Sequence, residues 1–265
     1  MPTIDVGMRF SSANPALNEK RFMKKTRLDK LLVDRGLFSD AGEVLRAVMA
    51  REVKVGDTYA ESAAMLVAPD ADVSVKASKR YVSRGGLKLR GALDAFGQSV
   101  RGLRCIDVGC STGGFTDCLL QAGAASVAAV DVGYGDLAWK LRQDDRVTVF
   151  ERTNIRLADP IELGAPFDLI VADLSFIGLA SLAPVFARLC AEGSVFIGLV
   201  KPQFESRHDE TDARGVVTDE AVRFRTVDEV RQALEDEGFT CTGVIESPIE
   251  GKRSGNIEYL VRAEW

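Results

Sequence analysis

The stretch that decides the fold is residues 105–116, which read Cys-Ile-Asp-Val-Gly-Cys-Ser-Thr-Gly-Gly-Phe-Thr. Apolar residues around Asp107 predict a strand, the glycines predict a tight turn, and the residues after the turn predict the start of a helix. This order is typical of an α/β protein that binds a ligand at the carboxyl ends of its strands. Such a turn can also bind nothing, but Asp131 falls where the next strand should end, and this favours a ligand site.

Three kinds of nucleotide-type site contain such a turn, and they need different residues. A dinucleotide site needs Gly-x-Gly-x-x-Gly, whereas the glycines here are Gly109, Gly113 and Gly114, and a phosphate-binding P-loop needs a lysine that the turn lacks. An S-adenosylmethionine site needs glycines for close approach, an acid that tolerates the positive charges of the methionine part, and a second acid for the ribose hydroxyls. Asp107 and Asp131 meet the last two needs, so the sequence favours S-adenosylmethionine as the cofactor.

The chain beyond this stretch alternates between strand-like and helix-like segments. The predicted strands are Arg104–Val108, Ser126–Asp131, Val147–Phe150, Phe167–Asp173, Ser194–Lys201, Thr240–Glu246 and Asn256–Arg262. A helix before the first strand has Leu89, Ala92, Leu93 and Phe96 on one face and ends at Gly97. Such alternation predicts a Rossmann-like α/β domain, with a seven-stranded, mostly parallel sheet and helices on both faces.

The N-terminal part has the pattern of a smaller α+β module. Leucines at helical spacing predict a short helix, stopped by Gly36, from Leu28, Leu31, Leu32 and Leu37. Asp40 and Glu43 predict a reciprocal N-cap for a second helix. The apolar positions of that helix are Val44, Leu45, Val48 and Met49. Two alternating segments, Glu52–Asp57 and Asp72–Lys76, predict strands that follow the helices.

We expect four parts along the chain. Residues 1–25 are polar and aperiodic and form a disordered leader, within which Met23 is an alternative natural start. Residues 26–78 form the smaller module, residues 79–86 a basic linker, and residues 87–265 the larger domain.

Charge divides the chain in the same way. Residues 1–104 carry 19 Lys and Arg against 12 Asp and Glu, whereas residues 105–265 carry 15 against 27, within a net charge of -5. A basic module joined to an acidic one indicates that the first part approaches a polyanion. Chance differences between solvated faces are the alternative.

Composition excludes several classes of protein. With 46% hydrophobic residues the chain can bury a core, but no apolar run reaches the ~20 residues of a membrane-spanning helix. The N-terminus does not read as a secretory signal peptide. Five scattered cysteines and one histidine, His208, form neither a disulfide framework nor a metal site. We therefore expect a cytoplasmic protein without a metal.

The smaller module resembles the S4 RNA-binding module. The resemblance lies in RLDKLLVDRGLFSDAGEVLRAVMAREVKVG and covers about residues 26–78. It implies a domain that grips structured RNA through phosphate contacts. The basic residues expected to bind RNA are Lys24, Lys25, Arg27, Lys30, Arg46, Arg51, Lys54 and, beside the larger domain, Arg84.

The larger domain resembles the FtsJ-like ribose methyltransferase domain, through DVGCSTGGFTDCLL and VAAVDVGYGDLAWKLRQDDRV. Together with YVSRGGLKLRGALDAF, FDLIVADLSFI, LVKPQFE, RGVV and GNIEYL, these strings resemble the haemolysin/TlyA family from Thr26 to Val261. That family joins an S4 module to such a domain and methylates ribose 2'-hydroxyls in ribosomal RNA. The resemblance implies the same reaction here, on a cytidine drawn out of its stack, with ribosomal RNA or ribosomal subunits as the partner.

Methylation of a ribose 2'-hydroxyl needs a group that removes its proton, and a lysine can do so when burial and a second cation lower its pKa. The sequence places charged residues beside apolar runs at predicted strand ends, and the resemblance carries the family's Lys-Asp-Lys-Glu tetrad onto Lys88, Asp173, Lys201 and Glu258. We expect Lys201 to accept the proton and Lys88 to assist it and to stabilise the developing alkoxide. Asp173 and Glu258 would orient the lysines.

The residues expected to hold the cofactor are Asp107, Gly109, Ser111, Thr112, Gly113, Gly114, Phe115, Asp131, Val132, Asn154 and Asp173. Residues 202–218 are expected to form a mobile loop over the site. Two other functions stay open at this point: a membrane-damaging haemolysin, and a non-catalytic RNA-binding factor in ribosome assembly. Neither a membrane nor an obligate protein partner is expected.

Overall fold

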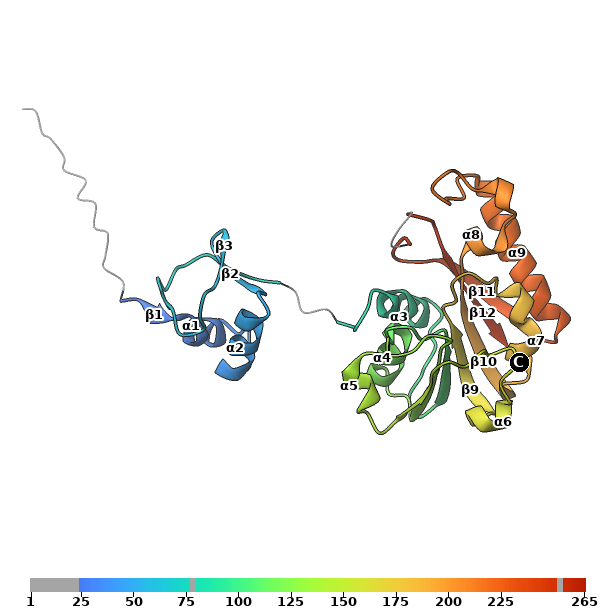
Figure 1. The fold of residues 1–265 in the computed structure, drawn as a ribbon, viewed down its shortest axis with the longest axis horizontal. Coiled ribbons are helices and arrows are strands. Elements are labelled where there is room, and N and C mark those ends of the chain that lie inside the picture. Colours follow the sequence, from blue (N-terminus) through green and yellow to red (C-terminus); the bar gives the residue numbers. More distant parts are fainter. Residues whose placement is uncertain (1–23, 77–79, 252–254) are drawn as a thin grey trace, which may run out of the picture. The chain divides into compact units, whose positions relative to one another are not determined.

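The structure is a computed structural model that describes residues 24–76, 80–251 and 255–265. The chain forms two compact units, Met1–Ser78 and Lys79–Trp265 (Figure 1). The leader expected over residues 1–25, including Met23, lies outside the described residues apart from Lys24 and Lys25.

The smaller unit packs two short helices against short strands. Its elements are β1 (Thr26–Arg27), α1 (Leu28–Asp34), α2 (Ala41–Met49), β2 (Val53–Val55), β3 (Thr58–Tyr59), β4 (Leu66–Val67) and β5 (Val73–Val75). Strand β2 pairs antiparallel with β3 and β5, and β1 pairs antiparallel with β4. The two predicted strands are thus present as β2 and β5. The other three have two residues each, which is too short for a periodic pattern.

The helix ends of the smaller unit follow from local chemistry. Gly36, with φ +70°, follows α1, as predicted, and Leu37 beyond it is exposed. Asp40 caps α2 by accepting a hydrogen bond from the Glu43 N–H. In the predicted reciprocal cap, the Glu43 carboxylate would accept from the Asp40 N–H. It accepts instead from the N–H and the hydroxyl of Ser39, one residue earlier in the chain.

The buried face of α2 uses only part of its apolar positions. Val44 and Val48 are buried with Ala47, whereas Leu45 and Met49 are 51% and 77% exposed. The small core is thus filled from one row of side chains, and Leu45 and Met49 lie outside that row.

The larger unit alternates strands and helices. Its elements are α3 (Gly85–Ala95), β6 (Arg104–Val108), α4 (Gly114–Gln121), β7 (Ser126–Val130), α5 (Trp139–Arg142), β8 (Val147–Phe150), α6 (Pro160–Leu163), β9 (Phe167–Ala172), the 3₁₀ helix η1 (Ala180–Leu182), α7 (Ala183–Ala187), β10 (Cys190–Val200), α8 (Pro202–Glu205), η2 (His208–Glu210), α9 (Glu220–Asp236), β11 (Thr240–Glu246) and β12 (Tyr259–Glu264).

The strands form one seven-stranded sheet in the order β11-β12-β10-β9-β6-β7-β8. Strands β10, β9, β6, β7 and β8 are parallel, and β12 runs antiparallel between β11 and β10. The chain moves outward from β6 to β8 and then returns to β9 on the other side of β6. Ligands bind at such a reversal, in the crevice beyond the carboxyl ends of the strands.

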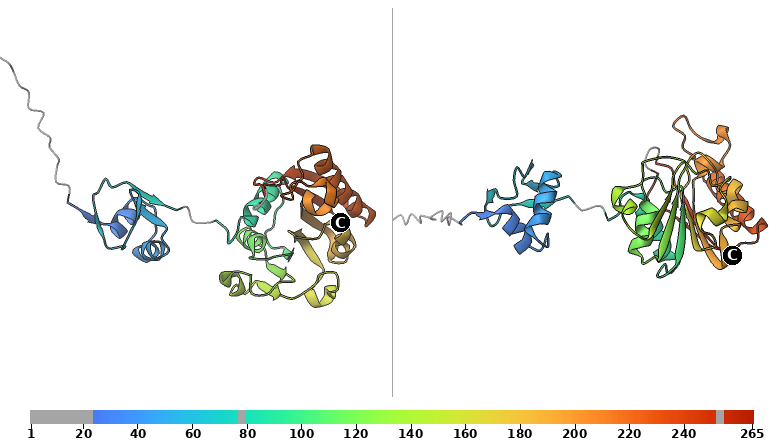
Figure 2. Two further views of the ribbon diagram at one scale, coloured as in Figure 1. Left: turned by 45° about the horizontal axis from the view of Figure 1, so that its top comes forward. Right: turned by 60° about the horizontal axis from the view of Figure 1, so that its bottom comes forward.

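Helices cover both faces of this sheet, as predicted. One core joins the sheet to α3, α4 and α5, and the other joins it to α6, α7 and α9. The right view in Figure 2 shows the green helices on one side of the sheet and the yellow and orange helices on the other. Because both faces are buried, the central strands are apolar along their whole length.

The predicted strand bounds hold for β6, β8 and β11, whereas the starts of β10 and β12 differ. Strand β10 begins at Cys190, before the predicted Ser194. Strand β12 begins at Tyr259 instead of Asn256, because the Asn256 side chain binds the backbone of Gly215 and Val217 and holds this segment away from the ladder.

The predicted linker over residues 79–86 also differs from the structure, where its described part belongs to the larger unit. Tyr81 is buried, the Val82 N–H donates to the Asp117 carboxylate at 2.8 Å, and α3 already begins at Gly85. The segment is therefore fixed beside the N-terminus of α4. Lys79 lies outside the described residues.

Gly113 forms the N-terminal boundary of α4 and needs to be glycine for two reasons. Its φ of +91° lies in the left-handed region, and a Cβ there would lie 2.2 Å from Leu141 Cδ1 and 2.7 Å from Leu137 Cδ1. A side chain would therefore be strained and would also collide with the core under α5.

We expect Gly113→Ala to destabilise the protein more than Gly102→Ala. Gly102 has φ +77°, but the space around its Cβ position is open. Gly102→Ala should therefore lower the free energy of unfolding only by the cost of the left-handed backbone, about 1–2 kcal/mol. The clash at Gly113 adds about 1–3 kcal/mol. Urea unfolding of both variants measures the difference, and equal losses would contradict the packing described for α4 and α5.

Candidate active site

The turn after β6 lies directly against the end of β9. Gly109 has φ +84°, and a Cβ there would lie 2.9 Å from the Asp173 carbonyl oxygen. The Asp173 N–H in turn donates to the Val108 carbonyl at 3.2 Å. Glycine at position 109 thus allows the two strand ends to meet, which brings Asp107 and Asp173 to the same point of the sheet edge.

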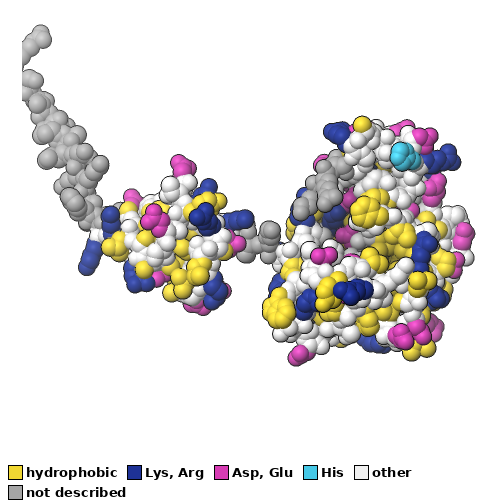
Figure 3. All heavy atoms as spheres, in the orientation of Figure 1, with side chains coloured by type: hydrophobic (Ala, Val, Ile, Leu, Met, Phe, Trp, Pro, Cys, Tyr) yellow, Lys and Arg dark blue, Asp and Glu magenta, His cyan; other side chains and the backbone are white. Residues whose placement is uncertain are grey.

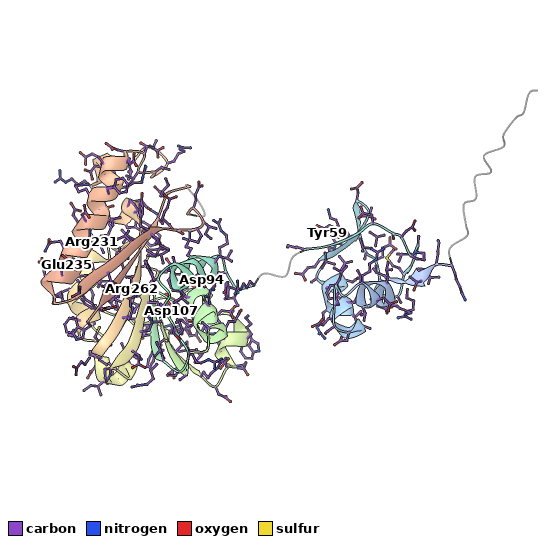
Figure 4. The ribbon with its side chains drawn as sticks, turned by 180° about the vertical axis from the view of Figure 1, so that it is seen from behind. Tyr59, Asp94, Asp107, Arg231, Glu235 and Arg262 are labelled. Carbon is purple, nitrogen blue, oxygen red and sulfur yellow. The ribbon has the colours of Figure 1, made fainter. Side chains whose placement is uncertain are left out.

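Asp107 is fully buried at this point, in the interior of the larger unit (Figure 4). Its Oδ2 accepts hydrogen bonds from the N–H and the hydroxyl of Thr116, at 2.9 and 2.6 Å, and so holds the first turn of α4. Its Oδ1 is buried without a hydrogen-bond partner among the described residues. Burial raises the pKa of the Asp107 carboxyl to about 7, and the charges of Asp173 and Asp131 add to the shift.

Asp131 follows β7 and braces the same turn. Its Oδ2 accepts from the Ser111 N–H at 2.8 Å, and its Oδ1 accepts from the Gly133 N–H at 2.7 Å. Ser111 has φ +47°, a conformation that costs energy for a non-glycine residue and that the Asp131 contact helps to hold.

Two cavities border the turn. They are adjacent, since Gly109, Ser111, Asp173 and Ser175 line both of them. The first has a volume of about 540 Å³ and is also lined by Lys88, Asp107, Thr112, Gly114, Phe115 and Lys201. The second has a volume of about 800 Å³ and is also lined by Asp131, Val132, Thr153 and Asn154. Of the residues expected to hold a cofactor, Gly113 alone lines neither cavity.

The first of two ion pairs at this edge joins Lys88 to Glu258. Lys88 lies on α3, and its Nζ donates to Glu258 Oε2. Their side chains are only 9% and 3% exposed. Glu258 was predicted inside the last strand, but it directly precedes β12 and lies behind Lys88, outside the lining of either cavity.

The second ion pair joins Lys201 to Asp173. Lys201 directly follows β10, and its Nζ lies 2.6 Å from Asp173 Oδ1 and donates to Ser175 Oγ at 3.2 Å. The two lysines therefore reach the first cavity from α3 and from β10, each held by its own carboxylate. Burial of two such pairs costs free energy, and this cost is characteristic of functional sites.

Several residues at the site were not predicted. Ser175 lines both cavities and binds Lys201. Phe176 is 87% exposed beside the second cavity, has φ +69°, and lies 5.5 Å from the Phe204 ring centroid. The only sequence signal for this segment is a serine and a phenylalanine within three residues of the acidic strand end at Asp173.

The described part of residues 80–86 also borders the first cavity. Ser83, Arg84 and Gly85 line it, and the Arg84 guanidinium donates to the Glu250 carbonyl at 2.6 Å. Arg84 was expected to bind RNA. The structure places it at the mouth of this cavity, with one side of its guanidinium already bound to the backbone.

The basic residues of the smaller unit fall into two groups. Arg27 and Lys30 are paired with acids, at 2.6 Å from Asp29 and 2.8 Å from Asp34. The other predicted RNA-binding residues of this unit carry no such ion pair within the described chain. They are Lys24, Lys25, Arg46 and Arg51, which are exposed, and Lys54, whose Nζ lies 5.1 Å from the Tyr59 ring centroid. Lys and Arg side chains are spread over the visible face of this unit (Figure 3).

Other predictions concern chemistry away from the site. Over residues 24–76, 80–251 and 255–265, no cluster of His, Cys, Asp and Glu has the arrangement of a metal site, and the five cysteines are free. In the same residues no helix is both long and apolar enough to span a bilayer. His208 is exposed, and the segment expected to be a mobile loop, residues 202–218, contains α8 and η2.

The chain is similar to known proteins both in its sequence and in its fold. Residues 81–265 match the family described as FtsJ-like methyltransferase. "Putative rRNA methyltransferase YqxC" of Bacillus subtilis (strain 168) is 45% identical, with 91% of this chain and 86% of that protein covered. "16S/23S rRNA (cytidine-2'-O)-methyltransferase TlyA" of Mycobacterium tuberculosis (strain CDC 1551 / Oshkosh) is 42% identical, with 90% and 89% covered. The solved structure "Putative hemolysin from Streptococcus thermophilus" is similar with a TM-score of 0.68 and 39% identity, with 91% and 89% covered.

We expect Asp107→Asn to remove a pH dependence of stability. The pKa of Asp107 is about 7 in the folded chain and 3.8 without the fold, so the folded state loses stability as pH rises from about 4 to 7. Asn cannot ionise, so the Asp107→Asn variant lacks this loss. The unfolding free energy of the variant minus that of the unsubstituted protein should therefore rise by a few kcal/mol between about pH 4 and 7, and it should stay constant above pH 7.

Urea unfolding at several pH values measures this difference. Asp94→Asn is the control, because Asp94 is exposed on α3, away from both cavities. A difference for Asp107→Asn that does not change with pH would contradict the buried, proton-binding state of Asp107.

Proposed function

The chain belongs to the haemolysin/TlyA family of proteins with an FtsJ-like methyltransferase domain, and on this premise we propose that it methylates a ribose 2'-hydroxyl of a cytidine in ribosomal RNA. The names of its relatives support the reaction and the substrate. The observation that carries the proposal is the convergence of Lys88 and Lys201, each held by a carboxylate, on the cavity beside the glycine turn.

The residues at the turn fit S-adenosylmethionine as the methyl donor. The buried Asp107 Oδ1 lacks a partner, and a cationic group in the first cavity would supply one. Gly109 and Gly114 leave no side chain in the way of a ligand that lies against the turn. Asp131 and Asn154 line the second cavity, where a carboxylate can accept from ribose hydroxyls and an amide can bind a base edge.

The donor, when bound, supplies an electrophilic methyl group on a sulfonium, and the protein has to position and activate the ribose oxygen. Asp173 lines both cavities, so it would pair with that positive charge as well as with Lys201. In its neutral amine form, Lys201 would take up the proton of the 2'-hydroxyl while the oxygen gains the methyl group, and Ser175 would keep the Lys201 Nζ in place.

Lys88 has a different part in the same step. Its ammonium is fixed by Glu258 in a site where both side chains are almost fully buried. A fixed positive charge stabilises the negative charge that develops on the ribose oxygen, and it costs no reorganisation when the reaction occurs. The pair Lys88–Glu258 therefore acts by electrostatics, and the pair Lys201–Asp173 acts by proton transfer.

The smaller unit is proposed to be an S4-like module that holds the ribosomal RNA, in the cytoplasm where ribosomes are found. Its exposed cations without an acidic partner suit contacts with phosphates, which give affinity without reading sequence. The aromatic residues make up only 7% of the chain, so stacking on a broad aromatic surface is not the basis of this binding. A non-catalytic RNA-binding role would leave the cost of the two buried ion pairs unexplained.

We expect Lys201→Ala and Lys201→Arg both to lose methyl transfer, by about 100-fold or more, with affinity for S-adenosylmethionine retained. Arginine keeps the positive charge but stays protonated at neutral pH, so it cannot act as the base. Transfer of labelled methyl groups to ribosomal subunits measures the effect, and calorimetry measures cofactor binding.

The matched control is Arg188→Ala, because Arg188 is exposed and lines neither cavity. It should keep full activity. An active Lys201→Arg variant would show that position 201 acts through its charge alone and would refute the proton-transfer role.

We expect the double variant Lys24→Ala, Lys25→Ala to bind ribosomal subunits more weakly and with a smaller dependence on salt, because each lost phosphate contact lowers the slope of log K against log salt by about 1. Lys30→Ala is the comparison, since Lys30 already pairs with Asp34 and should have a smaller effect. Filter binding over a series of salt concentrations measures the slopes. An unchanged slope for the double variant would exclude these lysines from the RNA contact.

A further inference from the structure

Glu205 joins two segments that both carry catalytic groups. It is the last residue of α8, four residues after Lys201. Its Oε1 accepts a hydrogen bond from the Leu179 N–H at 2.5 Å, and the neighbouring Ala180 N–H helps to lower the pKa of its carboxyl. Leu179 and Ala180 end the segment that begins at Asp173 and lead into η1. The carboxylate therefore connects the segment after β9 to the segment after β10.

The contact is close on both sides. A Cβ at Gly178 would lie 2.3 Å from Glu205 Oε2 and 3.1 Å from the Phe204 carbonyl oxygen. A side chain at position 178 would therefore displace the carboxylate from the backbone of Leu179. This close approach indicates a specific fit between the two segments.

The carboxylate lies where an acid is costly. The pKa of the Glu205 carboxyl is raised to about 7. Burial is the main cause and the charge of Glu229 on α9 adds to it, whereas the N–H groups of Leu179 and Ala180 act in the opposite direction. No ion pair to Glu205 is present within the described chain, and its partners are backbone donors. A half-buried acid without a cation is explained if its hydrogen bonds hold something that function needs.

The two segments that Glu205 joins contain the reacting pair and its neighbours. Asp173 and Ser175 lie on the first and Lys201 on the second, and Lys201 binds both of them. The rings of Phe176 and Phe204, one from each segment, are 5.5 Å apart, and Lys201 Nζ lies 5.9 Å from the Phe204 ring centroid. A shift of one segment against the other would change the Lys201–Asp173 distance directly.

We propose that Glu205 is a positioning residue that locks the segment of residues 173–180 against the segment of residues 201–205, and thereby sets the distance between Asp173 and Lys201. This inference rests on the proposed function for its catalytic consequence, but not for the lock itself. Because a misplacement of about 1 Å can lower a rate about 100-fold, a lock outside the cavities can control the rate.

The lock is tested first by hydrogen exchange, which needs no substrate. In the full chain, Glu205→Ala should make the Leu179 amide exchange about tenfold faster, because this amide loses its acceptor. Glu205→Gln keeps an acceptor oxygen and should preserve most of the protection. Glu162→Ala is the control, since Glu162 is exposed and makes no hydrogen bond to this segment in the described structure, and it should leave the exchange unchanged.

The catalytic consequence is tested by methyl transfer to ribosomal subunits with the same variants. Glu205→Ala should lower kcat about 10- to 100-fold with little change in KM for S-adenosylmethionine, and Glu205→Gln should restore most of kcat. Gly178→Ala, which pushes the carboxylate away, should reproduce the effects of Glu205→Ala, and it replaces that variant if Glu205→Ala does not fold.

The outcomes separate the two proposals. Unchanged amide exchange in Glu205→Ala and Gly178→Ala overturns the lock, whatever the substrate is. Faster exchange with an unchanged kcat overturns its role in positioning Lys201. An unsubstituted protein that transfers no methyl group to RNA refutes the proposed function, while the exchange experiment still decides whether the lock exists.

Discussion

The larger unit depends on holding two ammonium groups, almost out of contact with water, at one edge of its sheet. An unpaired buried ammonium is too costly to keep, so each lysine needs a carboxylate at hydrogen-bond distance. Lys88 and Glu258 are 170 residues apart in the chain, and they meet only because α3 packs on the sheet beside the residues that enter β12. Lys201 and Asp173 meet because β10 and β9 are parallel neighbours that end at the same edge. The topology of the sheet is thus a condition for the chemistry.

The glycine turn supplies the other half of the site. Gly109 allows the end of β6 to approach the end of β9. One carboxylate oxygen of Asp107 accepts hydrogen bonds from the first turn of α4, and the other has no hydrogen-bond partner in the described structure. The two cavities that share this turn can hold the two halves of one ligand, with acids placed for a positive charge in one and for ribose hydroxyls in the other. A methyl donor across both would lie next to the lysine that is proposed to activate the ribose oxygen.

Much of this arrangement could be predicted from the sequence, because strands buried on both faces are continuous apolar runs and their ends are marked by charged residues. The pattern placed Asp173 and Lys201 at strand ends, and it placed Glu258 inside the last strand, whereas Glu258 directly precedes β12. The sequence pattern could not indicate contacts that depend on tertiary approach. Glu205 and Leu179 are 26 residues apart, and nothing local shows that one caps the other. The exposure of Leu45 and Met49 likewise follows from packing and not from periodicity alone.

The central claim, that this chain methylates a ribose oxygen in RNA, is tested most directly by the identity of the product nucleoside. Ribosomal subunits from cells that lack the enzyme would be incubated with the protein and methyl-labelled S-adenosylmethionine, and the RNA would then be digested to nucleosides and separated by mass spectrometry. The account predicts that the label appears in 2'-O-methylcytidine. Label on a nucleobase, or no label in RNA while the protein binds the cofactor, would contradict it.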